Sequence, residues 1–288
     1  MPGTLFVVAT PIGNLEDLSM RALRTLREVD LIAAEDTRRT SKLLAHYEIQ
    51  KPLASLHEHN ETREAIRLIS KLESGLNVAL VSDAGTPSIS DPGSHFVAQA
   101  RQAGIPVVPI PGANAAVAAI SAAGLPVDSF LFLGFPASGG LARERWFERV
   151  AAEPSAVVFY ESPHRIRRTM DELAKYLGKR TIIVGRELTK VNEELVVWDK
   201  TIALREQGEF VVVVGPAESL PVQEPDAAAV ARFQGQLTEK LGLDETEALE
   251  LTATHFGVGR PKAVKLLKKG LILLKRSKDN QALTSSEE

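Results

Sequence analysis

The chain has 288 residues, with 34 Lys and Arg against 37 Asp and Glu and a formal net charge of −3. Its hydrophobic content of 44% and charged content of 25% are those of a globular protein, which excludes a disordered tail or a disulfide-rich miniature as the whole chain. Because cysteine is absent, thiol nucleophiles, thiolate metal sites and disulfides are excluded as well. At about 150 residues per domain, the length predicts roughly two domains.

Nothing in the sequence indicates a membrane segment. No run of about 18 apolar residues is long enough for a transmembrane helix, and the first residues lack the basic region of a signal peptide. We therefore expect a cytoplasmic protein with no membrane partner.

The first part of the chain alternates short apolar runs with segments of helical periodicity. Runs bounded by turn residues predict buried strands at Thr4–Ala9, Leu31–Ala34, Pro52–Leu56, Val78–Val81 and Ile105–Val108. Apolar spacing predicts helices around Ala22–Val29 and Ala65–Leu72, and a third over residues 92–103 with Asp91 as its N-cap. This alternation predicts an α/β domain with a mainly parallel sheet over residues 1–112.

A second series of strands follows a stretch of small residues. It is predicted at Phe130–Phe135, Ala156–Tyr160, Thr181–Gly185, Leu195–Val197 and Phe210–Val214. The last two strands follow one another without a helical segment of useful length, so the sheet should be mixed and partly antiparallel. We expect a second α/β domain over residues 113–217.

The C-terminal part is predicted to be helical. Pro216–Pro225 is rich in Pro, Glu and Ser and indicates a linker. Apolar residues recur at helical spacing from Val230 to Leu237, and a helix–turn–helix-like unit spans about residues 245–270. We expect a helical module over residues 228–276, and residues 277–288 are polar and predicted to be disordered.

This module carries a strong charge asymmetry. Between His255 and Lys278 there is no acidic residue, and the eight basic residues are Arg260, Lys262, Lys265, Lys268, Lys269, Lys275, Arg276 and Lys278. The rest of the chain holds 26 basic against 37 acidic residues. On a helix beginning at Pro261, Lys262, Lys265 and Lys269 share one face. A solvated lysine face remains an alternative, but the contrast with an acidic body favours an RNA-docking patch.

Three turns follow predicted parallel strands and contain glycine: Thr10–Asn14 (TPIGN), Ser82–Pro87 (SDAGTP) and Pro111–Ala115 (PGANA). Open α/β sheets bind ligands at this edge, and glycine lets a ligand approach the backbone amides closely. One such turn could simply reverse the chain. Three in one sheet predict a shared ligand pocket.

Several common site motifs are missing. No G-x-G-x-x-G follows the first strand, and the chain contains neither a P-loop nor a G-x-S-x-G elbow. The cluster HEHNE at 57–61 departs from H-E-x-x-H because Glu61 stands where the second histidine belongs. We therefore expect no dinucleotide fingerprint, no serine nucleophile and no metal.

The motifs resemble the tetrapyrrole methylase superfamily of S-adenosylmethionine-dependent methyltransferases. The segments that carry the resemblance are TPIGNLEDLSMRAL from Thr10, AAEDTRRTSKLL from Ala33, HEHNE from His57, VALVSDAGTPSISDPG from Val78, PIPGANAAVAAISAAGLP from Pro109, FYESPHR from Phe159 and GRELTK from Gly185. They keep the family's order over nearly the whole chain to about residue 270. Within the family, they are most similar to enzymes that methylate the 2′-hydroxyl of a cytidine in small-subunit (16S) rRNA.

The resemblance implies two α/β domains with S-adenosylmethionine in the cleft between them, and usually a homodimer. The implied partner is small-subunit rRNA or the assembled small ribosomal subunit. The implied cofactor-binding residues are Pro11, Ile12, Ser82, Asp83, Gly85, Thr86, Ile89, Gly112, Ala113, Asn114, Ala115, Tyr160, Glu161 and Leu188. The chain departs from the family at Ala113, where proline is usual, at Ser138–Leu141, which replaces a lysine-richer segment, and at Val191 and Asn192.

Methyl transfer from a sulfonium needs mainly orientation of the reactants, but a ribose hydroxyl is a poor nucleophile. A nearby carboxylate, lysine or arginine should therefore accept or accommodate its proton. The candidates at strand ends are Glu35, Asp36, Arg38, Arg186, Glu187 and Lys190. An ion-pair network between the domains or between the subunits of a dimer would explain each of them equally well. His57, His59 and His164 are further candidates, although each alone is better explained as a positioning residue.

Two other functions stay open. A methyltransferase for a small tetrapyrrole or similar ligand would share the fold, but it would not need the basic helical module. A ribosome-binding protein of this fold without catalysis would be separated by its failure to bind S-adenosylmethionine.

Overall fold

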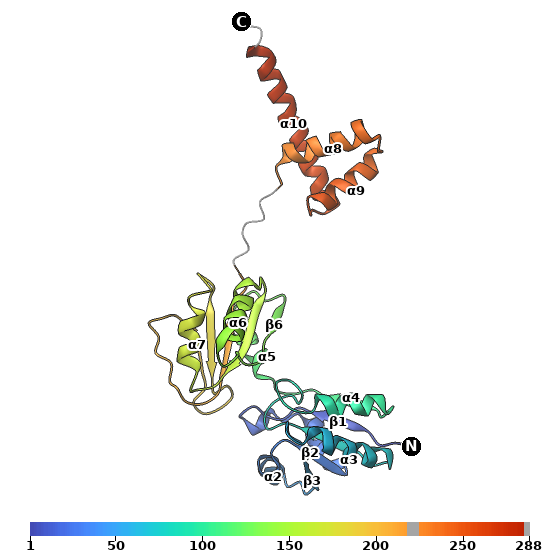
Figure 1. The fold of residues 1–288 in the computed structure, drawn as a ribbon, viewed down its shortest axis with the longest axis vertical. Coiled ribbons are helices and arrows are strands. Elements are labelled where there is room, and N and C mark those ends of the chain that lie inside the picture. The colour runs from blue at the N-terminus through green and yellow to red at the C-terminus, as the bar shows by residue number, and fades with distance from the viewer. Residues whose placement is uncertain (218–224, 285–288) are drawn as a thin grey trace. The chain divides into compact units, whose positions relative to one another are not determined.

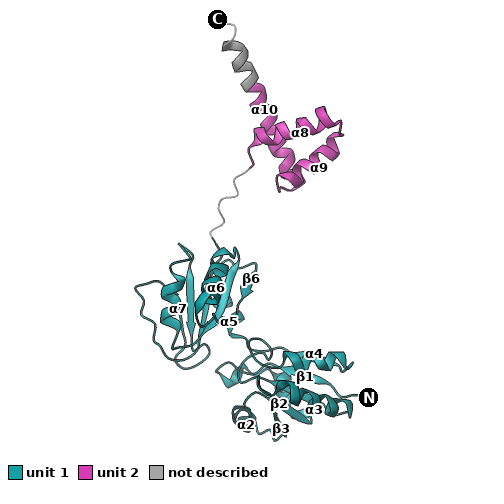
Figure 2. Cartoon of the chain, in the orientation of Figure 1, with its two compact units in different colours: residues 1–218 teal, residues 219–288 magenta. Residues whose placement is uncertain are grey.

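The computed structural model describes residues 1–217 and 225–284, with side chains as far as Arg276. The chain divides into two compact units, Met1–Glu218 and Ser219–Glu288 (Figure 2). Of the predicted linker Pro216–Pro225, residues 218–224 lie outside the described residues.

The first sheet lies in the N-terminal half of unit 1 (Figure 1). Its strands are β1 (Leu5–Val8), β2 (Leu31–Ala34), β3 (Leu53–Ser55), β4 (Val78–Val81) and β5 (Val107–Ile110). They are parallel in the order β3-β2-β4-β1-β5, which confirms the predicted parallel sheet. The fifth strand begins two residues later than predicted. The Ile105 amide donates to the Ala100 carbonyl at 2.9 Å, so Ile105 still belongs to the end of the preceding helix.

Helices cover both faces of this sheet. They are α1 (Met20–Glu28), α2 (Thr37–His46), α3 (Glu61–Glu73) and α4 (Ser94–Gln102), with a short 3-10 helix at Leu15–Asp17. Side chains of β2 alternate between the faces: Leu31 and Ala33 pack with α3 and α4, whereas Ile32 and Ala34 pack with α1 and α2. A strand buried on both faces is apolar throughout, as β2 is.

The predicted cap of α4 is wrong. Its N-cap is Gly93 at φ 120°, not Asp91. The Glu61 Oε1 atom accepts hydrogen bonds from the amides of Gly93, His95 and Phe96 at 3.0, 2.9 and 3.1 Å. A carboxylate from the first turn of α3 thus satisfies the free amides of α4, and this leaves Asp91 outside the helix.

The second sheet consists of β6 (Phe130–Phe132), β7 (Ala156–Glu161), β8 (Ile182–Arg186), β9 (Glu194–Trp198) and β10 (Phe210–Val214). Its order is β6-β7-β10-β8-β9, with β6 and β7 parallel and the other pairs antiparallel, as predicted for a mixed sheet. Its apolar clusters include residues of α5 (Ala115–Ala122), α6 (Gly140–Ala152) and α7 (Ile166–Leu173). The predicted boundary between two domains near residue 112 remains a prediction, because Met1–Glu218 forms one compact unit.

Unit 2 contains α8 (Ala227–Leu241), α9 (Glu245–His255) and α10 (Arg260–Thr284). Its core includes Val230 and Leu266. A Cβ atom on Gly270 would lie 1.8 Å from the Ala227 carbonyl oxygen, so α8 and α10 meet backbone to backbone.

The prediction of disorder from residue 277 is wrong for residues 277–284, which continue α10. No Gly or Pro follows Gly270 to end the helix. Residues 285–288 lie outside the described residues. Within residues 1–217 and 225–284, none of the helices combines the length and apolar character of a membrane span.

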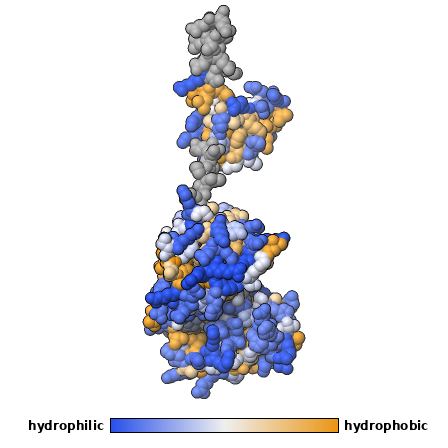
Figure 3. Space-filling model, turned by 60° about the vertical axis from the view of Figure 1, so that its left-hand side comes forward, coloured by the Kyte–Doolittle hydropathy of each residue, from blue (hydrophilic) through white to orange (hydrophobic). Residues whose placement is uncertain are grey.

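The surface of unit 2 mixes hydrophobic and hydrophilic residues (Figure 3). Its exposed large apolar side chains are Leu241, Leu251, Leu271, Ile272 and Leu273. On α10, Ala263 and Leu266 are buried while Lys265, Lys268 and Lys269 are exposed, in agreement with the predicted two-faced helix.

Candidate functional site

The three glycine-containing turns meet at one edge of the first sheet. Thr10 and Gly85 form an isolated bridge in which each amide donates to the other's carbonyl, at 2.8 and 3.1 Å. The Thr86 hydroxyl donates to the Ala113 carbonyl at 3.2 Å. The turns after β1, β4 and β5 are therefore joined, as the parallel sheet predicts.

These turns form one wall of a cavity of about 360 Å³, which we call the first cavity. The opposite wall comes from the second sheet and its loops. The predicted cofactor residues that line the first cavity are Ile12, Gly85, Thr86, Ile89, Asn114, Ala115, Tyr160, Glu161 and Leu188. Several other lining residues were not predicted from the sequence, among them Asp91, Phe135 and Glu209.

The segment between β4 and α4 bends around this cavity. Gly85, Ser88, Ser90 and Gly93 all have positive φ, with Ser88 at 67° and Ser90 at 62°. L-residues rarely adopt this conformation, and it is common at ligand-binding segments. A Cβ atom on Gly85 would also lie 3.3 Å from Ile12 Cγ2, so glycine keeps the two turns close.

Asp91 places a carboxyl group in the first cavity. Burial raises its pKa to about 6, a hydrogen bond from Ser82 opposes this, and the charges of Glu35 and Asp83 add to the rise. Among the residues that the structure describes, Asp91 makes no ion pair. A cationic ligand group in the cavity would supply the missing counter-charge.

Another carboxylate in the cavity wall, that of Glu161, already has hydrogen-bond partners within the protein. Glu161 is buried, and its carboxylate accepts hydrogen bonds from the Ser162 amide at 2.7 Å, Arg165 Nε at 2.8 Å and the Thr169 hydroxyl at 2.6 Å. Burial raises the pKa of Tyr160, whose ring packs edge-on against Phe135 with centroids 5.7 Å apart. This side of the cavity therefore offers apolar surface.

The other predicted cofactor residues lie outside the first cavity. Ser82 is buried and its carbonyl accepts a hydrogen bond from the Thr10 hydroxyl at 3.2 Å. A Cβ atom on Gly112 would lie 2.9 Å from Ala9 Cβ, so this glycine is needed for packing. Ala113 accepts the bond from Thr86. These three residues do not line the first cavity, and they support the turns instead.

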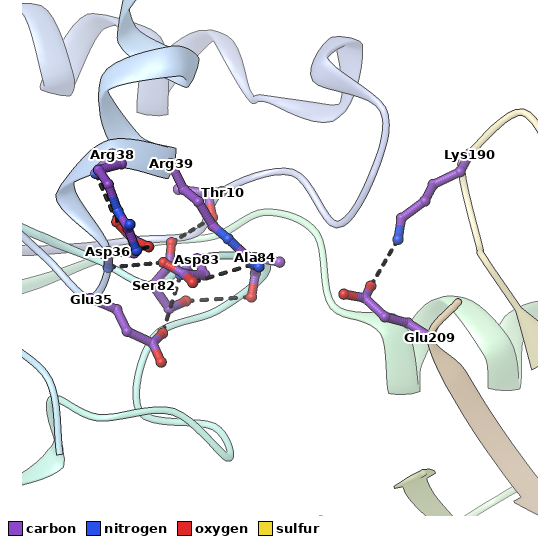
Figure 4. Close-up of polar contacts among 10 residues, drawn as sticks. All are labelled: Thr10, Glu35, Asp36, Arg38, Arg39, Ser82, Asp83, Ala84, Lys190 and Glu209. Atoms are coloured by element: carbon purple, nitrogen blue, oxygen red, sulfur yellow. Dashed lines mark hydrogen bonds and ion pairs between the residues drawn. The ribbon is translucent and has the colours of Figure 1, made fainter. Parts of the chain in front are cut away.

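A second cavity of about 300 Å³ adjoins the first, because Ile12, Ala84 and Glu209 line both. Its remaining lining residues are Thr10, Pro11, Gly13, Leu15, Arg39, Lys42, Leu43, Asp83 and Lys190. Pro11 and Asp83, predicted to bind cofactor, thus lie here. Figure 4 shows the polar contacts around this cavity.

Glu35, Asp36 and Arg38 follow β2 but line neither cavity. Asp36 caps α2 and pairs with Arg38 at 2.7 Å, which holds its pKa well below the usual range. Burial raises the pKa of Glu35, whose Oε2 atom accepts a hydrogen bond from the Asp83 amide at 3.3 Å. The pair of Asp36 and Arg38 is local to the start of α2, so it tests neither a catalytic role nor a network between domains.

Arg186 is also held in structural contacts. It is buried, and it donates from Nε to Glu194 at 3.0 Å and to the carbonyls of Gln207 and Asn192 at 3.3 Å each. The guanidinium therefore ties the loop after β8 to the loop before β10 and does not face either cavity.

Lys190 is the predicted catalytic residue that reaches a cavity. Its Nζ atom lies 2.8 Å from Glu187 Oε1 and 3.0 Å from Glu209 Oε2. Burial lowers the pKa of Lys190, but the hydrogen bonds to the two carboxylates outweigh it and the net pKa is raised. The same ammonium group lowers the pKa of Glu187. Lys190 is thus a cation at neutral pH, held between two carboxylates.

The histidines line neither cavity. The rings of His57 and His59 meet edge to face with centroids 6.0 Å apart, and the His57 amide donates to Asn60 Oδ1 at 2.8 Å. In the described part of the chain, no group of three or more His, Asp or Glu residues could hold a metal ion.

Comparison with known proteins agrees with this architecture. The family model for tetrapyrrole (corrin/porphyrin) methylases matches residues 4–202, and the chain belongs to this family, as the sequence motifs predict. The chain is 50% identical over 273 residues to ribosomal RNA small subunit methyltransferase I of Xylella fastidiosa, covering 90% of this chain and 97% of that protein. It is 46% identical over 261 residues to the protein of the same name from Pseudomonas aeruginosa, covering 88% and 93%.

The fold is also similar to a crystal structure of uroporphyrin-III C-methyltransferase from Thermus thermophilus complexed with S-adenyl homocysteine. The TM-score is 0.52 at 19% identity, and the match covers 73% of this chain and 97% of that one. At this identity the likeness establishes the fold.

Glu209 could not be predicted from the turns that follow strands, because it comes before a strand. Glu209 precedes β10, which runs antiparallel to β8, so the start of β10 lies beside the end of β8. The sequence predicted a mixed sheet but not the order of its strands. The observed pairing of β10 with β8 is what places Glu209 near Arg186 and Glu187.

Proposed function

We propose that the chain is an S-adenosylmethionine-dependent methyltransferase that modifies the 2′-hydroxyl of a cytidine in small-subunit rRNA. The similarity to relatives named ribosomal RNA small subunit methyltransferase I extends over most of both chains. The observation that carries the proposal is the junction of the two cavities at Ile12, Ala84 and Glu209. This junction supports a cofactor site in the first cavity and an acceptor site in the second, on either side of one shared wall.

The first cavity fits the cofactor chemically. S-adenosylmethionine combines an apolar adenine with an ammonium and a sulfonium, and it supplies an activated methyl group. Ile12, Phe135 and Leu188 provide apolar lining, while the backbone of the joined turns offers hydrogen bonds. Asp91 provides a carboxylate without a counter-charge inside the described chain. The cavity therefore complements both the apolar and the cationic parts of this molecule.

The residues at the shared wall handle the acceptor hydroxyl. Oxygen gains the methyl group and loses its proton, so a base and a nearby cation both favour transfer. Glu209 can accept the proton, and the Lys190 ammonium can stabilise developing negative charge on the oxygen. Glu187 holds Lys190 in place from the other side.

Unit 2 docks the RNA. Its exposed lysines on α10 lie on a packed helix whose opposite face is buried, and no acidic residue occurs between His255 and Lys278. Contacts between lysines and phosphates supply affinity for RNA that does not depend on its nucleotide sequence. We further propose that the enzyme is a homodimer and that it acts in the cytoplasm. Light scattering on the purified chain would test the dimer.

The decisive experiment measures transfer of a tritiated methyl group to small ribosomal subunits, to free rRNA and to a tetrapyrrole. We expect transfer to RNA, and protection of one linkage from alkaline hydrolysis, since a 2′-O-methyl group removes the attacking hydroxyl. Transfer to the tetrapyrrole alone would support the small-molecule alternative. Failure to bind S-adenosylmethionine by calorimetry would support the non-catalytic one.

Two variants on one helix test the cofactor site. Ala115→Leu adds bulk to the lining of the first cavity, whereas Val117→Leu adds it on the exposed side of α5. We expect only the first to weaken cofactor binding, with similar melting temperatures for both. Equal cofactor affinity in the two variants would contradict this placement.

A further inference from the structure

The second cavity is lined by cations as well as by the residues of the shared wall. Arg39 and Lys42 come from α2, and Lys190 comes from the loop after β8. Two of these cations have acidic partners: Arg39 Nη1 lies 3.3 Å from Asp83 Oδ2, and Lys190 lies between Glu187 and Glu209. Figure 4 shows the pairs Arg39–Asp83 and Lys190–Glu209.

Lys42 differs from the other two. The Lys42 side chain is exposed at the cavity, and it makes no hydrogen bond or ion pair within the part of the chain that the structure describes. The Arg39 side chain is 65% exposed, so its pair with Asp83 is worth little and can exchange for another anion. One turn of α2 separates the two residues, which therefore lie on the same side of the helix.

The lining favours a sugar and phosphates over a base, since Arg39, its one arginine, lies 3.3 Å from Asp83 and offers the only plane among the described lining residues on which a base could stack. Its apolar members are Pro11, Ile12, Leu15, Leu43 and Ala84, and none of the lining residues is aromatic. Stacking of an unpaired base usually uses an aromatic or arginine plane. The cavity thus offers charge and a narrow apolar floor, which suits a sugar and its phosphates.

We propose that the second cavity binds the sugar–phosphate backbone at the acceptor nucleotide, with Arg39 and Lys42 contacting the flanking phosphates. This proposal rests on the proposed function, since it assigns the substrate side of that site. Phosphates held at α2 place the ribose toward the wall that both cavities share. The 2′-hydroxyl then lies beside Glu209 and Lys190, opposite the first cavity.

The proposal predicts a binding contribution that depends on salt and not on base identity. Each lost phosphate contact reduces the slope of log affinity against log salt by about 0.7 for a single strand. We therefore expect Lys42→Gln to flatten the slope by about 0.7 and Arg39→Gln plus Lys42→Gln by about 1.4. The Michaelis constant for RNA should rise while the affinity for S-adenosylmethionine stays unchanged.

The experiment measures filter binding of a single-stranded small-subunit rRNA fragment to the full chain saturated with S-adenosylhomocysteine, over a range of salt. Lys71→Gln on α3 and Arg101→Gln on α4 are matched controls, because both side chains are exposed and make no polar contact in the described chain, and neither residue lines a cavity. Lys42→Arg should retain the wild-type slope. Melting temperatures verify folding.

The outcomes separate the two proposals. If the wild type methylates rRNA but Lys42→Gln and the double variant keep its salt slope and Michaelis constant, the assignment of the second cavity is wrong. If the wild type transfers no methyl group to rRNA, the proposed function is wrong. The binding measurement still decides whether this cavity holds a nucleic-acid backbone, because it does not depend on turnover.

Discussion

Gly13 and Lys190 lie close together although they belong to loops that follow strands of different sheets, β1 and β8. A Cβ atom on Gly13 would lie 2.5 Å from Lys190 Cγ and 2.7 Å from Thr189 Oγ1. The neighbouring Asn14 amide donates to Thr189 Oγ1 at 3.0 Å. The turn after β1 therefore sets the position of the loop that carries Lys190, and both residues line the second cavity.

Substitution of Gly13 by alanine should displace Lys190 without unfolding the chain. A shift of about 1 Å at a reacting group can cost up to about 100-fold in rate, so we expect turnover to fall at least about tenfold with cofactor affinity retained. Gly139→Ala is the control, because a Cβ atom there meets nothing within 4 Å. Single-turnover rates that match in the two variants would show that this contact does not position the site.

Lys190→Ala and Glu209→Gln should lower turnover much more than they lower S-adenosylmethionine affinity, because both residues act on the acceptor hydroxyl. If Lys190 serves only as an ion-pair partner, its loss should reduce the melting temperature and leave turnover per folded molecule unchanged. Exposed pairs are worth about 0.2–1 kcal/mol. Calorimetric Kd, melting temperature and single-turnover rate together distinguish these results.

Asp91 should make both stability and cofactor binding depend on pH. Because its pKa rises from 3.8 to about 6 on folding, the folded chain binds the proton more tightly, and stability is lost as pH rises through 6. Asp91→Asn should therefore raise stability above pH 6, by about 1 kcal/mol after discounting for partial exposure, or about 2–4 °C in Tm. At pH 4 the two proteins should melt alike.

Cofactor affinity of the wild type should fall below pH 6 as the Asp91 carboxylate is neutralised. In Asp91→Asn the affinity should be weaker and nearly independent of pH in this range. An unchanged pH dependence of Kd in the variant would show that Asp91 does not contact the cationic part of the cofactor.

The lysines of unit 2 provide a separate test of RNA docking. Lys265→Gln, Lys268→Gln and Lys269→Gln together should reduce the salt slope of RNA binding by about two, at about 0.7 for each contact. A triple variant of Lys71, Arg101 and Lys179 on unit 1 removes the same charge as a control. Equal slopes in both triple variants would mean that the α10 lysines form only a solvated face.

Local sequence patterns predicted much of the architecture. Apolar runs identified the strands of both sheets, most clearly at β2, β4 and β10, because a strand buried on both faces must be apolar throughout. The absence of a helix before Phe210–Val214 predicted the mixed sheet. Helix α5 was not identified, because the run AAVAAISA is apolar throughout and shows no helical period.

The turns Thr10–Asn14, Ser82–Pro87 and Pro111–Ala115 could be placed together from the sequence alone, since parallel strands bring their carboxyl ends to one edge. The partners of charged side chains could not be predicted from the sequence. Glu61 caps α4, Asp91 faces the first cavity, and Lys190 pairs with Glu209 across 19 positions of the chain. Periodicity reports which face of an element is buried, but only the packing of distant elements decides which charges meet and which remain free for a ligand.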